Sequence, residues 1–137
     1  MISLTYEEIR NKHFSAALVK LGAHSGFNGK QAYHIGRIVD KLLTFEKKCV
    51  FDENKIHVKY AKKNEDGTLY VPEEKQSING YYEVDEAKIE DHEAEIKELM
   101  KEKIDLDKNK IPLTDLDHTG LTPAQVVAIE ALLDMEE

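Results

Sequence analysis

The chain has 137 residues, 41% of them hydrophobic, and a formal charge of −8 at pH 7. This length is enough for one modest core and too short for two ordinary domains, so we expect a single domain spanning residues 1–137. The sequence shows no apolar run of eighteen residues and no N-terminal secretion signal. We therefore expect no membrane span and no export. The single cysteine, Cys49, excludes an internal disulfide framework and fits a reducing compartment.

The charge is unevenly distributed along the chain. Residues 1–63 carry twelve Lys and Arg against six Asp and Glu, whereas residues 64–137 carry seven against twenty-one. The first part is therefore at +6 and the second at −14. Opposite charges favour contact between the two parts and influence the choice of partner. The acidic second part is a poor surface for nucleic acid, so we expect no direct nucleic-acid binding.

The first predicted helix begins after the extended residues Ile2–Leu4. Thr5 and Glu8 have the T-x-x-E spacing of a capping box, in which the Thr5 side chain accepts from the Glu8 amide. Apolar residues continue to Gly22, although the step at 11–13 can break the helix into two pieces. The glycine-rich stretch from Gly22 to Gly29 then predicts a loop that reverses the chain.

A long amphipathic helix is predicted from about Gly29 to Lys63. Its apolar side chains recur at steps of three, four and seven residues, at Ala32, Ile35, Val39, Leu42, Phe45, Cys49, Ile56 and Tyr60. Cys49 lies on this stripe and is expected to be a buried thiol. Residues 55–61 also alternate with period two, so a strand remains an alternative there. We favour the helix because no Gly or Pro interrupts residues 37–64.

The next segment predicts a minor β element followed by a second helix. Thr68–Val71 and Tyr81–Val84 are rich in β-forming residues and flank the turn-like sequence 77–80, which favours a small hairpin or an ordered loop. Asp85–Lys103 has the pattern of a charged helix. Ile104–Asp107 is a short extended piece that can pair with Ile2–Leu4.

A C-terminal helix is predicted from Thr122 to Met135. Thr122 is the N-cap, Pro123 the first helical residue, and Gln125 completes a capping box. The predicted fold is mainly α. It has two long helices packed antiparallel, a short N-terminal helix, the C-terminal helix and a minor β-hairpin or extended element.

The sequence contains no recognisable catalytic or metal-binding constellation. Asp105, Asp107 and Asn109 have the spacing of the first three ligands of a calcium-binding loop. Such a loop also needs a glycine at the sixth position and a glutamate at the twelfth, where this chain has Lys110 and Leu116. The six histidines lack zinc-ligand spacing, and no nucleophile or dinucleotide motif is present. We therefore expect a protein that is not an enzyme and binds no cofactor or metal.

Two surfaces are candidates for binding a protein partner. The first is the acidic stretch 83–107, with eleven acids and four lysines, where Glu90 and Glu93 lie near Tyr81 and Tyr82. Tyrosine is enriched at interfaces, and an acidic face can mimic phosphate, although a solvated helix face is the commoner role of such a stretch.

The second candidate surface is on the C-terminal helix, which has more apolar surface than one contact face needs. Val126, Ile129 and Leu133 share one side of this helix. Left exposed, they would form a contiguous apolar patch of the kind that soluble monomers avoid. We therefore predict a contact with a partner or with a second copy of the chain at these residues.

Four sequence stretches resemble a group of short proteins of unknown function encoded by tailed bacteriophages and prophages. They are Ile2–Ile9, Lys30–Ile35, Lys62–Gly67 and Leu121–Ala124. The resemblance implies a phage protein located in the host cytoplasm or the virion, and transfers no catalytic residues. We expect a non-enzymatic protein that acts through protein–protein contacts as a small virion or assembly component. The alternative is an acidic inhibitor of a host defence or nucleic-acid-processing enzyme.

Overall fold

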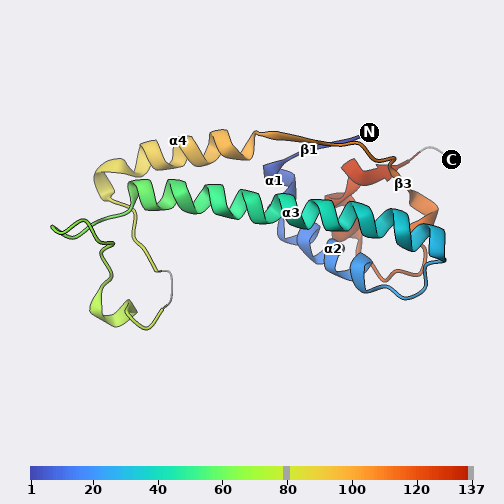
Figure 1. Ribbon diagram of the computed structural model, residues 1–137, viewed down its shortest axis with the longest axis horizontal. Helices are drawn as coiled ribbons and strands as arrows, with labels where there is room; N and C mark the ends of the chain where they lie inside the picture. Colours follow the sequence, from blue (N-terminus) through green and yellow to red (C-terminus); the bar gives the residue numbers. More distant parts are fainter. Residues whose placement is uncertain (79–80, 136–137) are drawn as a thin grey trace. The chain divides into compact units, whose positions relative to one another are not determined.

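The computed structural model describes residues 1–78 and 81–135. The chain is mainly helical with a small antiparallel two-stranded sheet, which confirms the predicted class (Figure 1). Its elements in chain order are β1 (Ile2–Thr5), α1 (Tyr6–Ile9), α2 (Lys12–Ala23), α3 (Gly29–Tyr60), η1 (Glu73–Lys75), η2 (Glu86–Lys88), α4 (Ile89–Met100), β2 (Lys103–Leu106), β3 (Ile111–Pro112), η3 (Leu113–Leu116), α5 (Pro123–Ala128), η4 (Glu130–Leu132) and β4 (Leu133–Asp134), where η marks a short 3-10 helix.

By its internal contacts the chain divides into two compact units, where the sequence alone led us to expect one domain. Unit 1 comprises Met1–Lys47 and Lys101–Glu137, and unit 2 comprises Lys48–Met100. Helix α3 contributes its first part to unit 1 and its second part to unit 2. Within residues 1–78 and 81–135, no helix combines the length and apolar character needed to cross a membrane.

The predicted long helix is confirmed as α3, which continues through Tyr60 and so excludes the alternative strand over most of residues 55–61. Asn28 and Gln31 cap its start reciprocally, because each side chain accepts from the other residue's backbone N–H at 2.9–3.0 Å. Cys49 is buried, as the apolar stripe predicted.

The N-terminal part of unit 1 follows the sequence signals closely. Thr5 and Glu8 form the predicted capping box. The helix does break in two, because the Asn11 side chain accepts from the His13 amide at 2.8 Å and starts α2. Strand β1 pairs antiparallel with β2 and places Ile2 opposite Leu106, which confirms the predicted pairing of these two segments (Figure 1).

Unit 1 contains most of the buried apolar side chains. Both strands of the β1–β2 pair alternate buried and exposed residues, so one face of this small sheet joins the core. Among the described residues of unit 1, the buried apolar ones are Ile2, Leu4, Tyr6, Ile9, Phe14, Ala17, Leu18, Leu21, Ile35, Ile38, Val39, Leu42, Ile104, Leu106, Ile111, Leu116, Ile129, Leu132 and Leu133.

The predicted C-terminal helix is too long by two turns. Helix α5 begins with the predicted capping box at Thr122 but ends at Ala128. Leu133 and Asp134 instead form β4, which pairs parallel with Ile111 and Pro112. No Gly or Pro follows Ala128 to mark the end of the helix in the sequence. The change depends on the pairing of Leu133 with Ile111, a distant residue.

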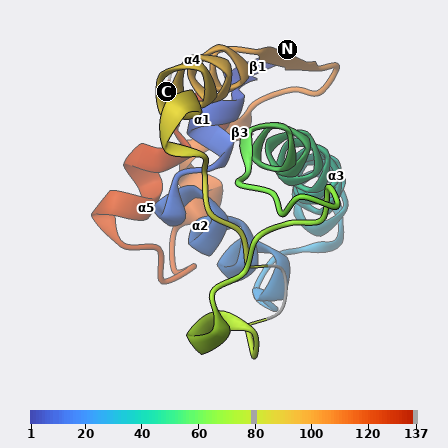
Figure 2. The ribbon, with the colours of Figure 1, turned by 90° about the vertical axis from the view of Figure 1, so that its left-hand side faces the viewer.

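Unit 2 also departs from the predicted elements. The charged helix begins with the 3-10 turn η2, where the Asp85 side chain accepts from Ala87 N–H, and α4 ends at Met100 instead of continuing to Lys103. The segment between α3 and α4 is mostly irregular (Figure 2).

For the segments 68–71 and 81–84 the sequence predicted a small hairpin or an ordered loop, and the hairpin is wrong. Leu69 bridges Lys63, and Val84 bridges Ala61, so both segments pair with the residues that follow α3. The predicted turn residues Asn79 and Gly80 lie outside the described residues.

Candidate protein-interaction site

The seven predicted contact residues fall into different units. Val126, Ile129 and Leu133 belong to unit 1, whereas the two tyrosines and two glutamates belong to unit 2. The predicted single binding set therefore separates into two groups, which are described in turn.

Two of the three residues predicted for a partner contact on the C-terminal helix are buried within their own chain. Ile129 is 0% exposed and Leu133 is 2% exposed, so their own chain already covers them. Val126 is half-buried, and the side chain that does reach solvent is Val127, at 69% exposure. The helical projection failed because the helix ends at Ala128, and the residues after it no longer follow its 100° step.

The two predicted tyrosines are half-buried and bonded within unit 2. The Tyr82 ring stacks on the His57 imidazole, with the centroids 4.8 Å apart and the planes 20° from parallel. The Tyr81 hydroxyl donates to Glu83 Oε1 at 2.8 Å. This hydrogen bond raises the pKa of Tyr81, and burial raises the pKa of Tyr82. Both rings thus take part in holding the segment before α4.

Helix α4 has a solvated acidic face and an inner polar face. Glu90 and Glu93 are exposed, as the prediction of a surface contact requires. On the inner face, Glu95 accepts from Lys59 Nζ at 2.6 Å and from the Tyr60 hydroxyl at 2.8 Å. These two hydrogen bonds lower the pKa of Glu95 and keep the carboxylate charged.

A pair of histidines also joins α3 to α4. His57 Nδ1 lies 2.8 Å from His92 Nε2, a distance that requires one nitrogen to donate and the other to accept. Burial and then the neighbouring His92 lower the pKa of His57, while Glu53 opposes this shift. Double protonation would remove the shared hydrogen bond, so the pair favours at most one positive charge.

These polar groups do not form a metal site. In the part of the chain that the structure describes, no cluster of three or more His, Cys, Asp or Glu side chains could hold a metal ion. The histidine pair and the Glu95 cluster instead connect α3 with α4.

The sequence did not reveal an exposed apolar face on the second part of α3. Phe51 and Val58 are 59% and 46% exposed and, with Asn54 and Lys55, line a shallow groove of about 320 Å³. Lys55 Nζ lies 4.5 Å from the Phe51 ring centroid. The seven-residue spacing of Phe51 and Val58 was the available signal, because it places both on one helix face. The stronger stripe through Cys49 and Ile56 obscured it.

Unit 2 exposes more large apolar side chains than it buries. Among its described residues the buried apolar ones are Cys49, Ala61 and Leu99. Four large apolar side chains are exposed by 42–59%, namely Phe51, Val58, Ile78 and Ile89. Scattered apolar residues are normal on protein surfaces, but two of these line one groove.

Comparison with known proteins found no matching family model, no similar curated protein and no similar solved structure.

Proposed function

We propose that the protein is a non-enzymatic bacteriophage protein that acts through protein–protein contacts, as a small virion or assembly component found in the host cytoplasm or the virion. The observation that carries the contact function is the exposure of Phe51 and Val58 in unit 2, whose described residues include three buried apolar ones. A partner that covers the groove would remove this apolar surface from water at roughly 25 cal/mol per Å².

The phage assignment is supported by the sequence stretches that resemble phage and prophage proteins, in particular Ile2–Ile9 and Lys62–Gly67. The partner is a phage structural protein or a second copy of this chain. The proposed fold includes α4 packed antiparallel to the second part of α3, an arrangement supported by the opposite directions in which the two helices run in Figure 1. The contacts His57–His92 and Tyr60–Glu95 join them.

The test is to look for the chain in purified phage particles by peptide mass spectrometry, with the double variant Phe51→Ser/Val58→Ser expressed in place of the natural protein. We expect the natural chain in particles and the variant reduced at least about fivefold. Circular dichroism of the purified variant verifies that it still folds.

The matched control is Val19→Ser. Val19 is 65% exposed on helix α2 in unit 1, so its substitution removes a comparable apolar group from a surface without the groove. Incorporation of this variant should equal that of the natural chain. Absence of the natural chain from particles, or equal incorporation of all three chains, would contradict the proposal.

A second candidate is the acidic inhibitor of a host defence or nucleic-acid-processing enzyme, which the exposure of Glu90, Asp91 and Glu93 on α4 favours. The backbone of Lys103–Leu106, at the end of the acidic stretch, already pairs with β1. The partner would therefore bind chiefly to the exposed acids of α4. This candidate predicts that the chain binds a purified basic enzyme. The double variant Glu90→Gln/Glu93→Gln should weaken this binding, and Phe51→Ser should leave it unchanged.

A further inference from the structure

A positively charged hollow lies in unit 1, between the first turns of α3 and the segment from Lys108 to Asp115. Its volume is about 450 Å³, within the range of roughly 300–1,000 Å³ typical of small-molecule sites. Among the described residues that line it, four are cationic, Lys30, Arg37, Lys108 and Lys110, and Asp115 is the one acid. A local charge of +3 in a chain with a net charge of −8 is an unusual concentration.

Both walls of the hollow are held in place by the fold. Gln31 Nε2 donates to Asp115 Oδ1 at 3.0 Å, which ties η3 to the start of α3 and occupies the one carboxylate. Pairing of β2 with β1 and of β3 with β4 fixes the chain on either side of Lys108–Lys110. The hollow is therefore largely formed before any ligand arrives, which lowers the entropic cost of binding.

The charge of the hollow comes from side chains, because the start of α3 is already capped. Asn28 accepts from Gln31 N–H, and Gln31 accepts from Asn28 N–H. Arginine and lysine are the side chains that recognise phosphate, arginine through two parallel hydrogen bonds and lysine as a point charge. A neighbouring hollow of about 330 Å³ shares Arg37 and Lys108. It adds one cation, Lys41, and two acids, Asp105 and Asp107, so the positive charge is greater at the first hollow.

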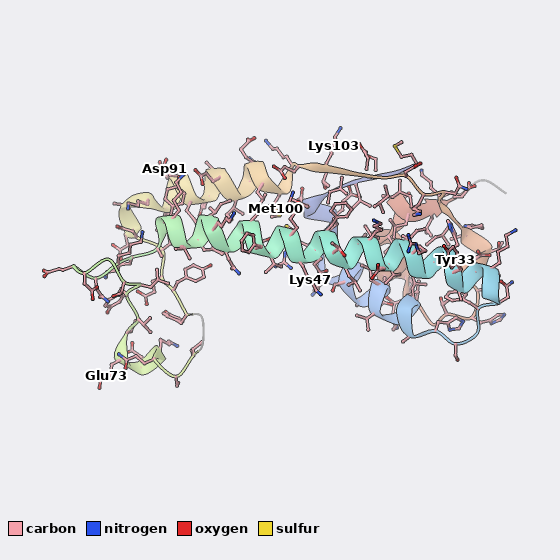
Figure 3. All side chains as sticks on the ribbon, in the orientation of Figure 1. Tyr33, Lys47, Glu73, Asp91, Met100 and Lys103 are labelled. Carbon is pink, nitrogen blue, oxygen red and sulfur yellow. The ribbon has the colours of Figure 1, made fainter. Side chains whose placement is uncertain are left out.

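An aromatic ring completes the lining. Tyr33 lies in the first turns of α3 and is 72% exposed (Figure 3). An exposed ring beside phosphate-binding cations offers a surface on which a nucleobase can stack. Inorganic phosphate would fill little of the 450 Å³ and would not use the ring.

From these observations we propose that the hollow binds a nucleoside triphosphate or diphosphate, with the phosphates on Arg37, Lys30, Lys108 and Lys110 and the base on Tyr33. A long nucleic acid fits less well. Its charges extend well beyond the Debye length of about 8 Å at physiological salt, and so meet the repulsion of the acidic remainder of the chain. A compact ligand stays within the local positive field.

The test is isothermal titration calorimetry of the full chain with ATP and, separately, with inorganic tripolyphosphate. We expect saturable 1:1 binding of ATP that weakens as salt is raised. Arg37→Gln should weaken it at least about tenfold, the loss typical of one charge-assisted contact. Lys12→Gln is the control, since it removes the same charge from an exposed position on α2 outside the hollow and should change the affinity less than twofold.

Tyr33→Ala separates the base from the phosphates. It should weaken ATP binding several-fold and leave tripolyphosphate binding unchanged. Absence of saturable ATP binding at low salt, or equal weakening by Lys12→Gln and Arg37→Gln, would overturn the proposal. If Tyr33→Ala had no effect on ATP, the assignment of a nucleotide would be wrong. Circular dichroism of each variant distinguishes lost binding from lost folding.

Discussion

At the scale of single residues, Val127 and Ile129 show how sharply exposure changes within one turn. Val127 is 69% exposed and Ile129 is fully buried. Ile129→Asp should lower the free energy of unfolding by about 3 kcal/mol or more, because it places a charge in the core of unit 1. Val127→Asp should change it by less than about 0.5 kcal/mol. Urea denaturation followed by circular dichroism measures both, and equal midpoints would show that Ile129 is not a core residue.

His57 provides a prediction about pH. Its folded pKa is lowered from the ordinary value of 6.5, chiefly by burial, so the unfolded chain binds this proton at a higher pH than the folded chain. The stability that depends on neutral His57 is therefore present above pH 6.5 and lost as the pH falls through the folded pKa. We expect the melting temperature to fall between pH 7.5 and pH 5.5, and to fall less in His57→Gln.

The control for this experiment is His118→Asn. His118 is exposed and has a φ of 66°, a conformation that asparagine also tolerates. Its pH dependence should match that of the natural chain. If His57→Gln also matched the natural chain, the His57–His92 pair would not be the source of the effect.

At the scale of elements, the capping boxes are the local signals that the structure reproduces most closely. Thr122 accepts from Gln125 N–H at 3.2 Å, and Gln125 accepts from Thr122 N–H at 3.0 Å. Thr122→Ala should cost about 1 kcal/mol of stability, the usual loss for an N-cap. Thr114→Ala, at an exposed position of η3, should cost less than about 0.5 kcal/mol. Equal midpoints for the two variants in urea would contradict the assigned role of Thr122.

The sequence predicted where helices begin better than where they end. Thr5, Asn11 and Thr122 mark helix starts through bonds within three residues, which a local pattern contains. The end of α5 depends on the pairing of Leu133 with Ile111, more than twenty residues away, which no local pattern contains. The missing hairpin has the same cause, because residues 68–71 and 81–84 pair with the chain after α3 instead of with each other.

The candidate site was only partly predictable for a related reason. The exposure of Glu90 and Glu93 follows from the charge pattern of α4. Phe51 and Val58 required knowledge of which residues α3 buries, since an apolar residue seven positions from another can equally belong to a core. The hollow beside Tyr33 brings together residues 30–37 and 108–115, a proximity set by the tertiary fold.

At the scale of the whole molecule, the two units differ in how much apolar surface they bury. Of the twenty-two buried apolar residues in the part of the chain that the structure describes, nineteen belong to unit 1 and three to unit 2. Regions with few buried apolar contacts open more readily, so amides of residues 61–78 and of α4 should exchange with deuterium faster than those of α2. Mass-spectrometric hydrogen exchange measures this difference. Equal protection of α2 and α4 would show that unit 2 does not depend on so small a core.

The claim that unit 2 contacts a partner is tested most directly by hydroxyl-radical footprinting of the chain, alone and in purified phage particles. Phe51 should be oxidised readily in the isolated chain and at least about fivefold less in the particle. The reason is that the partner covers the groove that Phe51 and Val58 line. Met1, 72% exposed in unit 1, serves as the internal reference and should keep its reactivity. Oxidation of Phe51 to the same extent in both samples would contradict the account.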